Sequence, residues 1–198
     1  MCKELLVDVV RVLGPDHPDT LHTRALLAHC KGRAGNRTGA VSVLEELLAD
    51  RVRVLGPDHP DTLHTRNNLI HWQGAARGAA GAAVAYEELL ADEVRVLGPD
   101  HPHTLHARHG LAHGRSRAGD PSGAVSVLEE LLADEVRVLG PDHPDTLTTR
   151  NNLASARGEA GDVAGAVAAR ALARHGASTR RPPPTHQDHP RKPHLLAV

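Results

Sequence analysis

The amino-acid sequence repeats itself, and this repeat restricts the fold more than any other feature. The string RVLGPDHP begins at Arg11, Arg53, Arg95 and Arg137, so equivalent residues lie 42 positions apart without insertions. A period of this length is typical of solenoids, in which each copy forms the same small unit and buries its apolar face against the next copy. Every residue is therefore interpreted together with its equivalents in the other copies.

Glycine and proline divide each copy into two helices. Gly56 follows an apolar run, where a residue with a left-handed backbone ends a helix, and Pro57 prevents the helix from continuing. Pro60 suits the first turn of the next helix, because its missing N–H needs no partner there. Asp61 adds favourable negative charge to that turn, although the third copy has His103 instead. Each copy is therefore expected to be a helical hairpin.

The same signals predict where the helices begin and end. First helices of the hairpins are expected near residues 18–33, 60–75, 102–117 and 144–159, and second helices near 37–55, 79–97, 121–139 and 163–175. Asp120 and Asp162 can cap second helices, whereas the corresponding break in the second copy reads Ala76-Arg77-Gly78. We expect the helix ends to fray most at this break.

The second helices are the more amphipathic ones. In the third full copy an apolar stripe is formed by Ala124, Leu128, Leu131, Leu132, Val136 and Leu139. The opposite side is interpreted as a solvated face that carries Glu129, Glu130, Asp134 and Glu135. The stripe is expected to be the surface on which neighbouring hairpins stack.

The two ends of the array differ from its middle. Residues 1–13 align with 43–55 and are interpreted as the second helix of a truncated repeat, with an exposed apolar patch at Leu5, Leu6, Val10 and Leu13. This patch makes self-association a candidate property. At the other end Arg170 and Arg174 replace leucines, which predicts that stacking stops there, and the Pro-, His- and Arg-rich residues 176–198 are expected to be disordered.

Composition and charge exclude several classes of function. Lys and Arg number 23 against 24 Asp and Glu, so the net charge of −1 offers no field for nucleic acid or anionic lipid. Phe is absent and Trp and Tyr occur once each, which argues against a large aromatic pocket. The chain has no apolar run long enough for a membrane span and no signal-peptide pattern, and its two cysteines have no metal-binding spacing. A cytoplasmic protein without nucleic-acid or membrane partners is expected.

The LGPDHPDTL…RNNL segments and the double-helix period resemble tetratricopeptide repeats of the kinesin-light-chain type over residues 1–175. The resemblance implies an all-α, right-handed superhelical solenoid of antiparallel helix pairs, with about 3.5 repeats plus a leading single helix. The repeat units would be residues 11–52, 53–94, 95–136 and 137–175. The usual first-helix aromatic position of the family holds Lys31, Gln73, Arg115 and Arg157, so the core should consist of Leu, Val and Ala. Similar arrays occur in actinobacterial multidomain signalling proteins.

The recurring Asp-His-Pro-Asp-Thr segment invites a catalytic interpretation, because Asp can orient a His and Thr can act as a nucleophile. An enzyme needs one preorganised site, however, whereas this segment recurs at every corner between copies. The simpler interpretation is that a cap for the following helix is provided by His17, His59, His101 and His143. We therefore expect no catalytic residue, no enzyme activity and no cofactor.

Other histidines form two columns on the first helices. One column contains His22, His64 and His106, and the other, seven residues later, contains His29, His71 and His113. Because seven residues are almost two helical turns, both columns project from the same side, which in the resembling family is the concave groove. A third column between them contains Asn67, His109 and Asn151, where the resemblance suggests amides that hydrogen-bond the backbone of a bound peptide.

These side chains predict an interaction scaffold whose groove binds a peptide or a partner protein. Protonation of the histidines near their ordinary pKa of about 6.5 would strengthen the binding of an acidic ligand. Three alternatives stay open: a detached piece of a larger nucleotide-dependent signalling protein, a metal-binding protein, and an RNA-reading helical repeat, which the neutral charge opposes. For the metal, the weak candidate ligands are His106, His109 and His113, together with the histidines of the tail.

Overall fold

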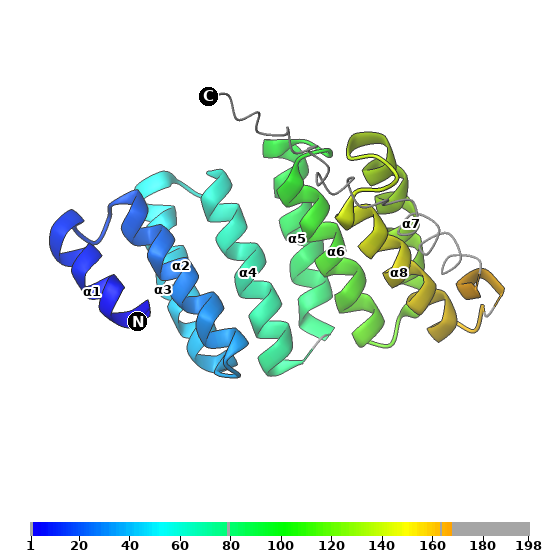
Figure 1. Cartoon of the computed structure of the whole chain (residues 1–198), viewed down its shortest axis with the longest axis horizontal. Helices are drawn as coiled ribbons and strands as arrows, with labels where there is room; N and C mark the ends of the chain where they lie inside the picture. Colours follow the sequence, from blue (N-terminus) through cyan, green and yellow to red (C-terminus); the bar gives the residue numbers. More distant parts are fainter. Residues whose placement is uncertain (1, 79, 163, 168–198) are drawn as a thin grey trace, which may run out of the picture.

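The computed structural model describes residues 2–78, 80–162 and 164–167, and these parts of the chain form helices joined by short connections (Figure 1). The helices are α1 (Cys2–Leu13), α2 (Pro18–Arg33), α3 (Arg37–Leu55), α4 (Pro60–Arg77), α5 (Ala80–Leu97), α6 (Pro102–Arg117), α7 (Pro121–Val138) and α8 (Pro144–Glu159). Each helix packs against the one before and the one after it. The predicted all-α solenoid of antiparallel helix pairs is therefore confirmed.

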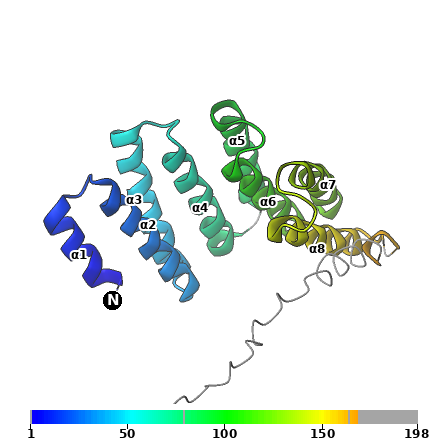
Figure 2. The same cartoon turned by 45° about the horizontal axis from the view of Figure 1, so that its top comes forward.

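The helices lie in two layers along the array. The first helices of the hairpins, α2, α4, α6 and α8, form one layer, and the second helices, α3, α5 and α7, form the other (Figure 1 and Figure 2). The expected bounds are matched within two residues, and the largest difference is that α4 continues to Arg77 before Gly78 ends it. Of the last expected helix, 163–175, residues 164–167 are helical. Arg170, Arg174 and the tail 176–198 lie outside the described residues.

The corner between copies has the same hydrogen bonds each time. At the second corner Gly56 ends α3 with a φ of +92°, a backbone conformation that favours glycine. The Nδ1 atom of His59 then accepts the backbone N–H of Asp61 at 3.1 Å, as the capping interpretation predicts. Thr62 donates its hydroxyl to the carbonyl of Gly56 at 2.8 Å, which joins the end of one helix to the start of the next. Equivalent bonds recur at His17, His101 and His143.

Thr62→Val should lower the free energy of unfolding by about 1 kcal/mol, because it removes one buried hydrogen bond while the side-chain volume is kept. The Thr62 side chain is completely buried, so water cannot replace the lost donor. Thr148→Val is the matched control, since that exposed hydroxyl donates to the carbonyl of Pro144 within its own helix. Urea unfolding of both variants measures the difference, and equal losses would contradict a special role for the corner threonine.

Each hairpin buries leucines against its neighbours, and the first helix of the array lacks one of those neighbours. Leu47, Leu89 and Leu131 occupy equivalent positions and are all 0% exposed. Their equivalent in α1, Leu5, is 54% exposed, and Val10 and Leu13 are also exposed. The predicted apolar patch is therefore confirmed at these three residues, whereas Leu6 is half-buried. Self-association through this patch stays a prediction.

Acidic residues of the second helices pair with arginines in a pattern that repeats along the array. Arg95 contacts both Asp58 of the preceding corner, at 2.8 Å, and Asp92 of its own helix, at 3.2 Å. Arg66 of the neighbouring first helix also contacts Asp92, at 2.7 Å. The same links recur one repeat on at Arg137 and Arg108, which both contact Asp134. Because these groups are partly exposed, each pair adds little stability, but together they hold the corner against both helices.

The interpretation of Glu135 as part of a solvated face is wrong. Glu135 is 1% exposed, and its equivalents Glu93 and Arg51 are buried as well. Leu128 and Leu131 lie seven and four residues before Glu135, which places all three on one side of α7. Val136, assigned to the apolar stripe, is instead 38% exposed. Each of the second helices α3, α5 and α7 therefore has one buried polar residue on its apolar side.

Candidate functional site

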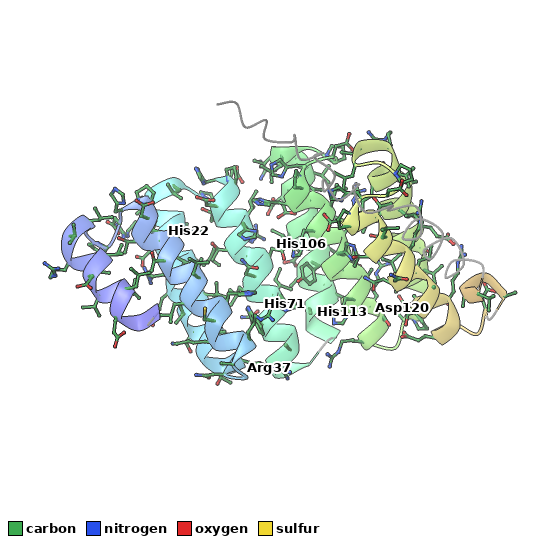
Figure 3. All side chains as sticks on the ribbon, in the orientation of Figure 1. His22, Arg37, His71, His106, His113 and Asp120 are labelled. Atoms are coloured by element: carbon green, nitrogen blue, oxygen red, sulfur yellow. The ribbon has the colours of Figure 1, made fainter. Side chains whose placement is uncertain are left out.

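A groove of about 650 Å³ runs along the layer of first helices, between α4, α6 and α8. Its apolar wall includes Ile70, Leu105 and Leu139, and Tyr86 reaches it from α5. Its polar wall includes four of the predicted histidines, namely His71, His106, His109 and His113. Figure 3 shows His71 on α4 and His106 and His113 on α6 in this part of the array. The structure thus brings these four predicted residues together in one hollow.

The remaining predicted histidines do not line this groove. His22 and His29 lie exposed on α2. His64 is half-buried and stacks on His103 of α6, with ring centroids 4.7 Å apart. Burial, reinforced by the neighbouring His103, lowers the pKa of His64 to about 4. His64 therefore belongs to the contact between α4 and α6 and stays uncharged near neutral pH.

The three members of the column between the histidines differ in their surroundings. Asn67 is 1% exposed, and its amide nitrogen and oxygen have no hydrogen-bond partner among the described residues. His109 is half-buried against α8, and Asn151 is exposed on α8. Equivalent positions of this column are therefore buried, half-buried and exposed in successive first helices. Contrary to expectation, Asn67 does not present its amide to the groove, and neither Asn67 nor Asn151 lines it.

His109 is part of a hydrogen-bonded chain that the sequence analysis missed. The Nε2 atom of His109 lies 2.7 Å from the hydroxyl oxygen of Thr149 in α8, and Thr149 donates to the carboxylate of Glu135 in α7 at 2.5 Å. On the other side of the ring, Nδ1 lies 3.4 Å from the amide nitrogen of Asn152. The signal that could have identified Glu135 was its spacing of four and seven residues from Leu131 and Leu128.

Burial governs the charge of the groove. It lowers the pKa of His71 and His109, and nearby histidines lower these values further. It raises the pKa of Glu135, an effect that the hydrogen bond from Thr149 opposes and the negative charge of Asp145 reinforces. Asp145 and Arg117 also line the groove. The groove therefore combines histidine rings with two acidic side chains, Glu135 and Asp145, and one basic side chain, Arg117.

The structure does not support a metal centre in the described part of the chain. Within residues 2–78, 80–162 and 164–167 no three His, Cys, Asp or Glu side chains come together as metal ligands. His106, His109 and His113, the weak candidates, therefore line the groove without forming such a group. The tail histidines lie outside the described residues. None of the described helices has the length and apolar character needed to cross a membrane.

Comparisons with known proteins agree with this architecture. Residues 20–61 and 104–145 match the family model described as tetratricopeptide repeat. A solved structure of kinesin light chain nearly identical TPR-like repeats from Podosopora anserina is 26% identical, with a TM-score of 0.71, and the match covers 91% of this chain and 86% of that one. A single-substitution variant of those repeats is 25% identical, with a TM-score of 0.73 and coverages of 89% and 84%.

A third solved structure shows the same fold. BtubC (BKLC) from P. vanneervenii has a TM-score of 0.75 at 22% identity, and the match covers all of this chain and 77% of that one. No curated protein matches the sequence significantly. The arrangement of successive helix pairs is therefore shared with solved proteins despite low sequence identity.

Proposed function

Because the chain belongs to the tetratricopeptide-repeat family, with repeats of the kinesin-light-chain type, we propose that it is a non-catalytic scaffold that binds a segment of another protein in the groove between α4, α6 and α8. Repeats of this family generally mediate protein–protein interactions. The observation that carries the proposal is the groove itself, which combines an apolar wall with a row of polar side chains. Such a combination suits a peptide, whose side chains need apolar contact and whose backbone needs hydrogen bonds.

The distribution of the chemistry-bearing residues also supports a scaffold. The Asp-His-Pro-Asp-Thr segment, which reads Asp-His-Pro-His-Thr at the third corner, has the same capping bond to its first histidine at all four corners, so this histidine already serves the fold. In the groove, the exposed His106 and His113 are free to contact a ligand. Burial lowers the pKa of His71 and His109, which favours the neutral form of these two rings in the groove.

The proposal is tested by changing the charge of the groove. His106→Glu together with His113→Glu should reduce partner recovery in affinity purification roughly tenfold, because two carboxylates would replace imidazole rings that line the groove. The matched control is Ser122→Glu together with Ser126→Glu, which adds the same charge to exposed positions of α7. Thermal unfolding of both double variants verifies that the fold persists. Equal recovery with the two variants would place the binding surface elsewhere.

A further inference from the structure

Three equivalent positions show what is particular about the α6–α8 end of the groove. The buried residue of the second helix is Arg51, Glu93 or Glu135 in successive repeats. Arg51 bonds to Thr65, but the residue equivalent to His109 in that repeat is Ala25. In the repeat of Glu93, the residue equivalent to Thr149 is Ala107 and the residue equivalent to His109 is Asn67. The carboxylate oxygens of Glu93 have no hydrogen-bond partner among the described residues. Only the trio of Glu135, Thr149 and His109 combines a carboxyl, a hydroxyl and an imidazole.

This trio also reaches the groove, whereas the earlier trios do not. Glu135, His109 and Asn152 all line the hollow, and Thr149 lies buried between the first two. The chain of contacts runs from Glu135 Oε2 through Thr149 Oγ1 and both ring nitrogens of His109 to the side-chain amide of Asn152. A hydroxyl and an imidazole each accept a hydrogen bond on one side and donate on the other. The hydrogen bonds that link these four side chains can therefore all point in either of two directions.

In the first direction Glu135 is ionised and accepts the hydroxyl hydrogen of Thr149. The Thr149 oxygen accepts from Nε2–H of His109, and Nδ1 accepts from the amide N–H of Asn152. The side-chain carbonyl oxygen of Asn152 can then accept a hydrogen bond from a ligand in the groove. The 2.5 Å contact to Glu135 is shorter than the 3.1 Å contact from Thr149 to the carbonyl of Asp145, which competes for the same hydrogen.

In the second direction one proton has been taken up from the groove. It forms a new bond at Nδ1 of His109, the Nε2 proton passes to the oxygen of Thr149, and the Thr149 hydroxyl proton passes to Glu135 Oε2. The neutral carboxyl now donates to Thr149, Thr149 donates to Nε2, and Nδ1–H donates to the carbonyl oxygen of the turned Asn152 amide. The side-chain NH₂ group of Asn152 can then donate a hydrogen bond to the ligand.

We propose that Glu135, Thr149 and His109 form a proton relay that switches the group which Asn152 presents to a bound segment from an acceptor to a donor. The proposal rests on the groove being the binding surface. It adds that protonation determines whether Asn152 accepts a hydrogen bond from the bound segment or donates one to it. Asp145 and His143, at the start of α8, act on the charge of Glu135, and His106 and Asp145 act on that of His109. Burial of Glu135 supports the second direction, because it favours the neutral carboxyl.

The relay is tested on the free 198-residue chain by NMR between pH 8 and pH 5. Labelled side-chain signals report the carboxyl of Glu135 and the two ring nitrogens of His109. We expect the ring proton to move from Nε2 to Nδ1 with the same midpoint as the titration of Glu135. A single tautomer throughout that titration, or an imidazolium with both nitrogens protonated, would overturn the proposal.

Two variants separate the relay from simple proximity. In Thr149→Val the carboxyl of Glu135 should still titrate while His109 keeps one tautomer, because the connecting hydroxyl is gone. In Glu135→Gln the tautomer should no longer depend on pH. Glu93 is an internal control in every sample, since its carboxylate oxygens have no hydrogen-bond partner among the described residues and Ala107 and Asn67 stand in place of Thr149 and His109. As no partner is present in these measurements, their failure would leave the scaffold proposal intact, and loss of partner binding would leave the relay intact.

Discussion

Glu93→Gln should stabilise the protein at neutral and alkaline pH by about 3 kcal/mol, although it changes only one atom of the side chain. Glu93 is 0% exposed, and both of its carboxylate oxygens lack a hydrogen-bond partner among the described residues. Burial therefore raises the pKa of Glu93 to about 7. Its ionisation in the folded state costs free energy, whereas a glutamine at this position stays neutral.

The direction of the pH dependence follows from proton binding in the two states. Between the ordinary pKa of 4.5 and the raised value of about 7, the folded protein holds a proton at Glu93 that the unfolded chain has released. The stabilising effect of this proton is complete below about pH 4.5 and is lost as the pH rises through 7. His64 acts in the opposite direction, because its lowered pKa reduces stability in acid.

Urea unfolding of the wild type and Glu93→Gln between pH 5 and pH 8 measures this effect. Only the difference between the two proteins is used, so the contribution of His64 cancels. The difference should be small at pH 5 and increase towards pH 8. Glu88→Gln, at an exposed position of the same helix, is the control and should change stability by about 0.5 kcal/mol or less. A difference that does not vary with pH would show that Glu93 is ionised equally in both states.

Gly110→Ala should destabilise the protein by about 1–3 kcal/mol, even though alanine is the better helix former. The ring of Tyr86, from α5, lies directly on Gly110 of α6, so a Cβ atom there would overlap the ring. Tyr86 is buried, and its ring cannot move without opening the contact between α5 and α6. Gly32 of α2 is likewise in contact with the ring of Trp72 of α4, although these two residues are not the repeat equivalents of Gly110 and Tyr86.

Gly81→Ala is the matched control, because Gly81 is an exposed helical residue of α5 with open space around its Cβ position. It should raise stability by up to about 1 kcal/mol through helix propensity. The two glycine substitutions are thus expected to have opposite signs. Thermal unfolding measures both, and stabilisation by Gly110→Ala would mean that Tyr86 has room to move away.

The fold could be predicted from local signals, whereas the site could be predicted only in part. Gly56, Pro57 and Pro60 restrict the backbone wherever they occur, so the helix bounds followed from them within two residues. The resemblance to kinesin-light-chain repeats is confirmed by the family match and the solved structures. His71 and His113, expected on one side of the first helices from helical periodicity, both line the groove.

Other features depended on what the neighbouring repeat places against a side chain. Asn67, His109 and Asn151 are equivalent by spacing, but the spacing does not predict that the first is buried, the second half-buried and the third exposed. In the same way, the charge of Glu135 led to the prediction that this side chain is exposed to solvent. In the structure the side chain is buried, and Thr149 of α8 donates a hydrogen bond to it.

The repeat, the positions of the helices and the caps at the corners follow from local chain properties, because they depend on the backbone conformations that glycine and proline allow and on bonds between residues a few positions apart. Which polar side chains are buried and which meet in the groove depends instead on how the hairpins pack. The reason is that burial is a property of a pair of surfaces, and the residues at 109, 135 and 149 come together only when successive hairpins stack in register.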